Sequence, residues 1–486
     1  MRRDASFVLA ATAAGGLAGL CWLPLGLAPL FPVAMLLAMR GLRRVRTPRG
    51  AVAFGLAFGA ARYVVAAHFL LALLSYSPLA IAIYALAIVF ILPFGVLECW
   101  GAFVLERRLR IPRGVGFGAL YVLGGWLRTL GDLSFPADRL AHAFGTDPAW
   151  LAASPWIGPT GLEVLVFASA ALLDRAIETR GSRPRAAVWA SSALAVWLSP
   201  VLLDAVGPSV PAPHPLRVGV VQPAVELADK MRKDRWPALW ARLEGLTVDA
   251  ARDADLVVWP ETARPSPLLW DGAAAFRDPE MEALARRVGV PILYGCEIAR
   301  RDAGVVTALY NGAAIAYPDG RPAVWYGKQH LLPFVEGVPF VRAFGWDPHR
   351  RTAGERRSLL TLLGPFTPGP PPPLFEVGGA RIGVLICFEG MYDALARRYR
   401  DAGADLLVVL TNDAWWDGSV FPEWHARMVA ARARETHLPV VRAANNGISA
   451  AIDPAGRLRN STRWGEATAM RPTDAADRSP TSLARR

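Results

Sequence analysis

In the stretch Arg381-Ile-Gly-Val-Leu-Ile-Cys387-Phe-Glu389, an apolar run ends in a cysteine, and a carboxylate follows two residues later. Short apolar runs bounded by glycine, here Gly379 and Gly390, are typical of buried β-strands. A cysteine that ends such a strand lies at the rim of a sheet, where nucleophiles are often presented. Free cysteines are among the most buried residue types, so Cys387 taken alone is more readily interpreted as inert core.

The sequence on both sides of this stretch alternates short apolar runs with polar segments of helix length. We predict strands at residues 217–221, 256–259, 291–294, 311–317, 382–386, 406–410 and 440–443. Helices are predicted between them, at residues 236–252, 279–288, 391–402 and 424–436. Strand–helix alternation over this half of the chain indicates a layered α/β domain.

The chain as a whole is more apolar than ordinary soluble proteins. Of its 486 residues 53% are hydrophobic and only 19% are charged, and the mean hydropathy is +0.28. This composition predicts that part of the chain lies in a membrane. The net charge of +12 comes from arginines clustered between apolar segments, which indicates membrane-flanking charge and argues against a nucleic-acid partner. The four cysteines lack paired spacing, so we predict neither a disulfide framework nor a metal site.

Residues 1–207 are predicted to form an α-helical transmembrane domain. A span needs about 20 mostly apolar residues, and we interpret seven segments as spans: 6–23, 25–39, 51–74, 78–105, 114–130, 155–173 and 187–206. The alternative for the first segment is a cleavable signal peptide. We do not favour it, because further apolar segments follow and no convincing Ala-x-Ala cleavage site precedes Leu25.

Basic residues gather in alternate loops of this domain, at residues 40–49, 107–113 and 175–185. The positive-inside rule places these loops in the cytoplasm. With an odd number of spans, everything after residue 206 is then expected on the extracytoplasmic face, the periplasm of a Gram-negative cell. A proline-rich linker at residues 208–215 leads to the α/β domain, which we assign to residues 216–464. Residues 465–486 are interpreted as a polar tail without a final span.

Three short apolar runs in this half of the chain are followed by reactive groups. Glu261 closely follows the strand at 256–259, Lys328 precedes a second glutamate at 336, and Cys387 ends the strand at 382–386. A thiol needs a base to become a nucleophilic thiolate, and a nearby lysine stabilises both the thiolate and a developing oxyanion. Each residue has a plainer interpretation: Glu261 as a helix cap, Lys328 as solvated surface and Cys387 as core. Together, however, they suffice for acyl transfer through a thioester.

The motifs Trp-Pro-Glu261, Tyr-x-Lys328-x-His-Leu-x-Pro-Phe-x-Glu336 and Cys387-Phe-Glu389, in that order, resemble the Glu-Lys-Cys signature of the nitrilase (carbon–nitrogen hydrolase) superfamily. The preceding membrane segments narrow the resemblance to one branch, the apolipoprotein N-acyltransferases of bacterial envelopes. The resemblance covers nearly the whole chain. It implies a polytopic membrane domain followed by a nitrilase-like α-β-β-α sandwich.

The resemblance also implies roles for the site residues. Glu261 is expected to be the general base, Lys328 to stabilise the tetrahedral intermediate, Cys387 to be the nucleophile, and Glu336 and Glu389 to support them. The implied reaction moves the sn-1 acyl chain of a phospholipid, typically phosphatidylethanolamine, onto the cysteine as a thioester. The α-amine of the S-diacylglyceryl cysteine of an apolipoprotein then takes it, in ping-pong order. The resemblance implies no metal or organic cofactor, and we expect a monomer.

A phospholipid acyl chain leaves a bilayer only at a cost of about 0.8 kcal/mol per methylene, so the site is expected to open at the membrane surface. The resemblance and the loop charges together imply the bacterial inner membrane as the localisation, with the catalytic domain on its periplasmic face. Aromatic loop residues are candidates for a lipid-facing mouth: Phe334, Phe340, Phe344, Trp346, Trp415 and Trp416. Ordinary packing under long loops is an equally good interpretation of these side chains.

Two other functions remain open from the sequence. A membrane-anchored amidohydrolase of the same superfamily would begin with the same chemistry and use water in place of the lipoprotein amine. A polytopic scaffold that only binds lipoproteins would need none of the three catalytic residue types. Cys296 and His425 match no catalytic position, and we interpret them as core and as helix surface or support for the site, respectively.

Overall fold

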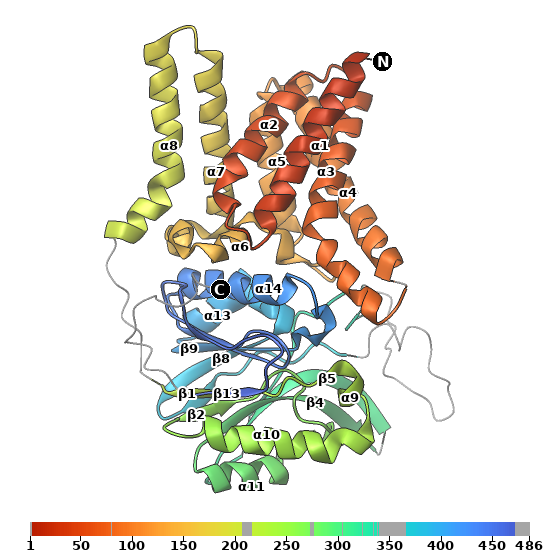
Figure 1. Cartoon of the computed structure of the whole chain (residues 1–486), viewed down its shortest axis with the longest axis vertical. Coiled ribbons are helices and arrows are strands. Elements are labelled where there is room, and N and C mark those ends of the chain that lie inside the picture. The colour runs from red at the N-terminus through yellow and green to blue at the C-terminus, as the bar shows by residue number, and fades with distance from the viewer. Residues whose placement is uncertain are drawn as a thin grey trace. The chain divides into compact units, whose positions relative to one another are not determined.

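The computed structural model describes residues 2–78, 80–206, 216–272, 277–303, 305–322, 324–333, 335–337, 339 and 366–471 (Figure 1). The chain divides into two compact units. The helical unit comprises Met1–Thr129, Pro136–Ser209 and Gly418–Glu435, and the α/β unit comprises Leu130–Phe135, Val210–Asp417 and Thr436–Arg486. Each unit therefore contains a segment that the chain order would assign to the other.

Helices occupy all seven of the predicted apolar segments. The long helices of this unit are α1 (Arg2–Trp22), α2 (Phe31–Arg43), α3 (Pro48–Ala66), α4 (Ala80–Leu109), α5 (Arg113–Leu127), α7 (Ser154–Glu178) and α8 (Arg183–Val206). Among the described residues, only α4, α7 and α8 are long and apolar enough to cross a membrane, and α3 gives a fourth span if it is joined to the short helix η2 (His68–Ser75) across a bend of 47°. The prediction of seven spans is thus not confirmed. The shortest of the seven, α2 and α5, have 13 and 15 residues, fewer than the roughly 20 that a span needs.

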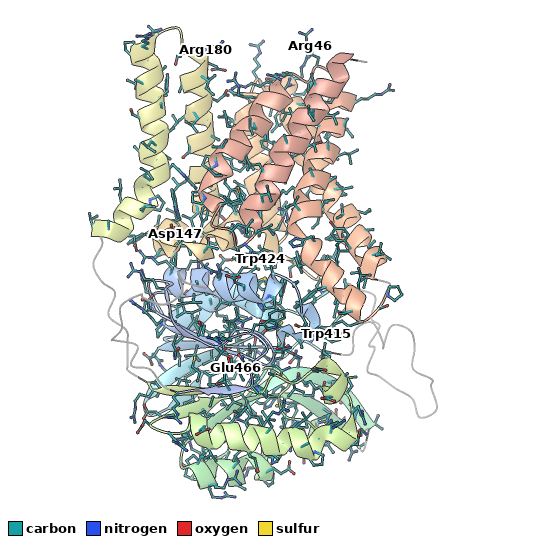
Figure 2. The ribbon with its side chains drawn as sticks, viewed as in Figure 1. Arg46, Asp147, Arg180, Trp415, Trp424 and Glu466 are labelled. Atoms are coloured by element: carbon teal, nitrogen blue, oxygen red, sulfur yellow. The ribbon has the colours of Figure 1, made fainter. Side chains whose placement is uncertain are left out.

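Charged loops lie at opposite ends of the helical unit. Figure 2 shows Arg46 and Arg180, which follow α2 and α7, at one end, and Asp147 at the other. The basic loops at residues 40–49 and 175–185 thus share one end of the helices.

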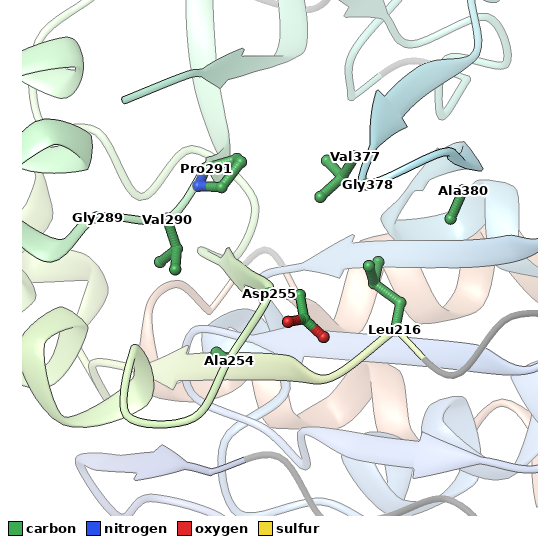
Figure 3. A pocket seen from close by; sticks show the side chains of 9 residues that line it. All are labelled: Leu216, Ala254, Asp255, Gly289, Val290, Pro291, Val377, Gly378 and Ala380. Atoms are coloured by element: carbon green, nitrogen blue, oxygen red, sulfur yellow. The ribbon is translucent and has the colours of Figure 1, made fainter. Parts of the chain in front are cut away.

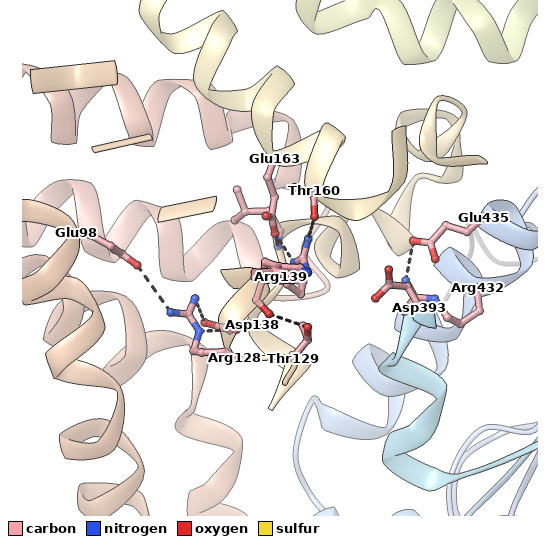
Figure 4. A network of polar contacts seen from close by, with 12 residues as sticks. Glu98, Arg128, Thr129, Asp138, Arg139, Thr160, Glu163, Asp393, Arg432 and Glu435 are labelled. Carbon is pink, nitrogen blue, oxygen red and sulfur yellow. Dashed lines mark hydrogen bonds and ion pairs between the residues drawn. The ribbon is translucent and has the colours of Figure 1, made fainter. Parts of the chain in front are cut away.

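A buried network of charges joins the short segment after α5 to the long helices (Figure 4). Arg128 pairs with Asp138 at 2.7 Å, and Arg139 pairs with Glu163 of α7 at 2.8 Å. Asp138 also accepts a hydrogen bond from Tyr63 of α3 at 2.5 Å. Buried charges are tolerated only when they are paired, so these pairs fix the segment from Pro136 onward within the helical unit.

The last helix of this unit is α14 (Phe421–Thr436), which lies far along the chain. Its aromatic side chains pack on rings from the amino-terminal helices: Phe421 stacks on Phe69 at 4.7 Å, and Trp424 meets Trp22 edge-on at 5.7 Å. Aromatic pairs at these separations are favourable. The prediction of a helix at 424–436 is confirmed, and packing places it with the helical unit.

The α/β unit contains two sheets that face each other. The first has the order β13-β1-β2-β4-β5-β6, with β3 also paired to β4, and the second has the order β12-β11-β10-β9-β8-β7. The first sheet consists of β1 (Val218–Gln222), β2 (Leu256–Val258), β3 (Leu268–Trp270), β4 (Ile292–Asp302), β5 (Val305–Ala316), β6 (Trp325–Gly327) and β13 (Thr468–Met470). The second consists of β7 (Phe375–Val377), β8 (Ala380–Ile386), β9 (Leu406–Thr411), β10 (Val440–Ala444), β11 (Ala450–Ile452) and β12 (Leu458–Ser461).

Two apolar layers hold this unit together. Val220, Val258 and Leu293 of the first sheet pack against Val384 and Val408 of the second. The outer face of the first sheet is covered by α10 (Trp236–Ala250) and α11 (Pro279–Val288), and α13 (Asp393–Asp401) packs on β8 (Figure 1). Near-continuous burial on both faces explains why the central strands are apolar runs. The predicted α-β-β-α sandwich is observed.

Each sheet has three parallel strands at its centre: β1, β2 and β4 in the first, and β8, β9 and β10 in the second. The carboxyl ends of neighbouring parallel strands lie along the same edge, where functional groups commonly gather. The first sheet includes residues beyond 464, where we predicted that the α/β domain ends, because β13 pairs with β1 through Val220 and Met470. Residues assigned to a polar tail thus supply an edge strand.

Candidate active site

The three predicted catalytic residues all follow the ends of strands. Glu261 comes three residues after β2, Lys328 directly follows β6, and Cys387 directly follows β8. The turn that carries Glu261 lies against Gly295 of β4, where a Cβ would come within 2.3 Å of the Pro260 carbonyl oxygen. Only glycine therefore allows β4 to approach this turn so closely.

The Glu261 carboxylate is buried and held from several sides. Its Oε1 accepts a hydrogen bond from Asn311 Nδ2 of β5 at 2.7 Å, and its Oε2 accepts one from the backbone amide of Asn412 at 2.9 Å. Lys328 Nζ lies 3.8 Å from Oε1. Burial raises the pKa of Glu261 even though Lys328 lowers it. A carboxylate with a raised pKa is a stronger base, which suits a proton acceptor.

Lys328 lies between the carboxylates of Glu261 and Glu336. Its Nζ pairs with Glu336 Oε1 at 2.8 Å and its side chain is 1% exposed. Burial opposes the charge, but Glu336, Cys387 and Glu261 outweigh it and hold the pKa of Lys328 above its ordinary value. Lys328 is therefore a fixed cation in a dry site, where it can stabilise a developing oxyanion.

Cys387 is partly accessible and has an unusual backbone conformation. It is half-buried, and its φ of 54° lies in the left-handed region that non-glycine residues rarely adopt. Such strain is often found at functional sites. Burial, followed by the charge of Glu261, raises the pKa of the Cys387 thiol, and Lys328 acts in the opposite direction. A thiol with a raised pKa needs a neighbouring base before it can react as a thiolate.

Glu389 connects the strand that ends before Cys387 to the segment that carries Lys328. This fully buried carboxylate accepts four hydrogen bonds. The donors are Tyr326 OH at 2.7 Å and the backbone amides of Gln329 at 2.7 Å, His330 at 3.0 Å and Ile386 at 2.8 Å. Glu389 therefore connects the backbone next to Lys328 directly to the backbone next to Cys387.

Comparisons with known proteins agree with this architecture. The family model described as carbon-nitrogen hydrolase matches residues 217–481, and that described as apolipoprotein N-acyltransferase N-terminal domain matches residues 14–172. The apolipoprotein N-acyltransferase of Gloeobacter violaceus is 33% identical over 95% of this chain and 87% of its own length. The corresponding protein of Azotobacter vinelandii is 31% identical over 95% of this chain and 89% of its own. The chain belongs to the apolipoprotein N-acyltransferase family. The resemblance drawn from the sequence motifs is confirmed, and the amidohydrolase alternative is not favoured.

The sequence motifs of this N-acyltransferase family do not reveal every residue around the site. Asn311, whose Nδ2 also contacts Glu336 Oε1 at 3.1 Å, lies at the start of a predicted strand and carried no signal of its own. Asn412 was given no role from the sequence, yet its backbone amide donates a hydrogen bond to Glu261 Oε2. Lys230 was missed altogether, although its Nζ donates to the Glu261 carbonyl oxygen at 3.3 Å.

A second missed feature is the loop Leu130–Phe135, which belongs to the α/β unit and contacts residues that follow Cys387. Phe135 stacks on Phe388 with ring centroids 5.1 Å apart, and Ser134 Oγ lies 2.7 Å from the hydroxyl of Tyr392. The ring of Tyr392 stacks on that of His330, with the ring centroids 4.0 Å apart. No sequence pattern links these positions, because more than 250 residues separate Ser134 from Tyr392.

Asp413, which also raises the pKa of Cys387, forms a buried ion pair with Arg442 at 2.7 Å. Both side chains are at most 1% exposed. A Cβ at the neighbouring Gly447 would lie 2.4 Å from Asp413 Oδ2. The segments after β9 and β10 are thus locked together beside the nucleophile.

The remaining predicted positions have mixed outcomes. Trp415 is 48% exposed and Trp416 is half-buried, whereas Phe334, Phe340, Phe344 and Trp346 lie outside the described residues. Cys296 is fully buried in β4, as predicted for core. The interpretation of His425 as helix surface is wrong, because the residue is 1% exposed on α14. Among the described residues, no three His, Cys, Asp or Glu side chains cluster as a metal site would require.

A surface cavity of about 550 Å³ lies elsewhere in the α/β unit (Figure 3). It is lined by residues that precede the strands, including Leu216, Ala254, Asp255 and Pro291. These mark the amino-terminal ends of β1, β2 and β4, whereas Glu261 and Cys387 follow carboxyl ends. The cavity is therefore separate from the candidate active site.

Proposed function

We propose that this protein transfers the sn-1 acyl chain of a phospholipid to the α-amine of the S-diacylglyceryl cysteine of an apolipoprotein. The observation that carries the proposal is the convergence of Glu261, Lys328 and Cys387 at one edge of the sheets, with a thiol that is protonated at rest and a buried base beside it. Phosphatidylethanolamine is the donor we expect.

In the first half-reaction, Glu261 takes the proton of the Cys387 thiol as sulfur attacks the ester carbonyl carbon. Lys328 stabilises the resulting oxyanion. The carbon–oxygen bond of the ester then breaks, and the proton passes from Glu261 to the alkoxide of the departing lyso-phospholipid. A thioester remains on Cys387.

In the second half-reaction, the neutral α-amine of the apolipoprotein attacks the thioester carbonyl. Glu261 accepts a proton from the attacking nitrogen, the carbon–sulfur bond breaks, and Glu261 returns this proton to the leaving thiolate of Cys387. The product is an amide-linked third acyl chain. Two substrates that occupy one site in turn give ping-pong kinetics.

We further propose that the helical unit is a multi-pass domain of up to seven spans in the bacterial inner membrane, with the α/β unit on the periplasmic side and the protein a monomer. The apolar helices and the shared end of Arg46 and Arg180 support this orientation (Figure 2). Exposed Trp415, beside Asn412, is suited to a lipid-facing mouth. A reporter that fluoresces only in the cytoplasm, fused after Leu216, should stay dark.

The experiment that tests the reaction is a trap of the acyl-enzyme. Purified protein in phospholipid should gain the mass of one acyl chain on the peptide that contains Cys387, and addition of a diacylglyceryl peptide should discharge it as an amide. Cys387→Ala should abolish the adduct, while Cys296→Ala, a change of a buried thiol in β4, should retain it. Discharge to free fatty acid alone, without amide, would favour a hydrolase.

A further inference from the structure

Lys230 contacts the segment that presents the catalytic base. It is the last residue of the four-residue helix α9 (Leu227–Lys230), shortly after β1. Its Nζ donates to the main-chain carbonyl oxygen of Glu261 at 3.3 Å and to the hydroxyl of Thr262. Both acceptors belong to the turn after β2, so one lysine side chain binds this turn at two consecutive residues.

The turn that carries Glu261 and Thr262 is also constrained by its own backbone conformation and by its contact with β4. Thr262 has a φ of 45°, and β-branched residues adopt this left-handed conformation only when their surroundings impose it. The backbone of Glu261 and Thr262 also lies so close to Gly295 of β4 that a Cβ there would be 2.7 Å from Glu261 Cα. The turn therefore has no room to relax toward β4, and Lys230 supplies hydrogen bonds that hold it in its strained form.

The charge of Lys230 acts on the same carboxylate. Lys230 faces two acidic groups, Glu261 and Glu297, and burial lowers the pKa of Lys230 to about 8. Glu261 in turn faces Lys328 and Glu336, with Cys387 also in electrostatic reach. Burial and Glu336 raise the pKa of Glu261, whereas Lys328 and Lys230 lower it. Two cations thus favour the ionised carboxylate, which is the form that accepts the thiol proton.

We propose that Lys230 is a positioning residue of the acyl-transfer reaction, which fixes the turn that carries Glu261 and keeps its carboxylate ionised. This inference rests on the proposed function of Glu261 as the base for Cys387. Lys328 stabilises the carboxylate directly, while Lys230 acts through the backbone and through its charge. The two lysines therefore have separate tasks.

The test compares Lys230→Met, which keeps the length of the side chain without its charge, with Lys230→Arg, which keeps the charge. Lys233→Met serves as a matched control, because Lys233 is exposed three residues further along. The rate of acyl-enzyme formation at Cys387 is measured against pH. As the pH falls, the rate should drop when Glu261 becomes protonated; this drop is the acid limb of the pH–rate profile. An opposite charge nearby lowers the pKa of a carboxyl by about 1–3 units. We therefore expect the acid limb of Lys230→Met to lie at a pH about one unit higher than that of the parent.

Below that limb the Met variant should react about tenfold more slowly than the parent. The difference should disappear above the limb, where Glu261 is ionised in both proteins. Lys230→Arg should restore the position of the limb, and Lys233→Met should match the parent. An unshifted acid limb in Lys230→Met, whatever its maximal rate or Tm, would overturn the proposal, since a purely structural role changes rate or stability alone.

A second measurement separates this inference from the acyltransferase proposal. Alkylation of Cys387 by iodoacetamide, followed by mass spectrometry over the same pH range, reports ionisation of the Glu261–Cys387 pair without any lipid. Parent protein that forms no acyl-enzyme would refute the proposed function. The alkylation profiles of parent and Lys230→Met would still decide the role of Lys230: displaced limbs support it, and superimposed limbs refute it.

Discussion

Replacing Glu389 with glutamine changes one oxygen to an amide and has a consequence that can be worked out from the donors around it. Oε1 accepts from the amides of Gln329 and His330, and Oε2 accepts from Tyr326 OH and the Ile386 amide. A glutamine whose oxygen takes the Oε1 position keeps the first two bonds. Its NH₂ group then donates to the Tyr326 hydroxyl but faces the Ile386 N–H, which loses its acceptor. The reverse orientation orphans two amides instead of one, so it is less favourable.

One buried N–H without an acceptor costs about 1–3 kcal/mol, and the two retained bonds lose the strength that a charged acceptor gives them. We therefore expect Glu389→Gln to lower the free energy of unfolding by about 2–4 kcal/mol. In a unit of this size, that corresponds to a fall in apparent Tm of roughly 5–10 °C. Because Ile386 immediately precedes Cys387, acyl-enzyme formation should also slow by about tenfold to a hundredfold.

The assay pairs thermal unfolding of the detergent-solubilised protein with the acyl-enzyme rate at Cys387. Tyr326→Phe is the matched control: it removes one neutral donor to the same carboxylate and leaves the three amide bonds, so its cost should be only about 0.5–1.5 kcal/mol. A Glu389→Gln protein that unfolds at the temperature of the parent and forms acyl-enzyme at the same rate would refute the reasoning. So would a Tyr326→Phe protein that is the more damaged of the two.

Two further changes test the surroundings of the base and the nucleophile. Glu336→Gln removes a negative charge that raises the pKa of Glu261, so the acid limb of the acyl-enzyme rate should move to lower pH, in the direction opposite to that of Lys230→Met. An acid limb that moves to higher pH would contradict this account. Asp413→Asn leaves Arg442 buried beside a neutral partner, which should destabilise the protein by about 3–5 kcal/mol; the double change Asp413→Asn with Arg442→Met should recover part of that loss in thermal unfolding, and no recovery would argue against the ion pair as the cause.

The parts of the fold that the sequence predicted are those buried on both faces. The strands at 256–259, 382–386 and 406–410 are apolar runs because they lie between layers, and each is found within a residue or two of its predicted position. Short edge strands were missed. β12 (Leu458–Ser461) is half-exposed and polar, and pairing with β11 across the sheet, rather than any local pattern, makes it a strand.

The positions of Glu261, Lys328 and Cys387 were predictable because these residues occur in motifs with fixed neighbours. Asn311 was not, since a single asparagine in a strand has no periodic signal, and its role arises only from the pairing of β5 with its neighbours in the first sheet. The prediction of seven spans is not confirmed for a related reason. Apolar composition marks a helix such as α5 but does not fix its length, which here ends at Leu127.

The two units exchange short pieces of chain, and this limits how the protein can be divided. A shortened protein that begins at Leu216 would contain every motif of the carbon–nitrogen hydrolase domain, yet it would lack Leu130–Phe135, which belongs to the same unit. Phe388 would lose the ring stacked upon it, and Tyr392 would lose both of its hydrogen bonds to Ser134. Conversely, a protein cut before Gly418 would leave Phe69 and Trp22 without the aromatic rings of α14. Neither half is a transplantable module, so this acyltransferase cannot be rebuilt by joining a soluble hydrolase to an unrelated membrane anchor.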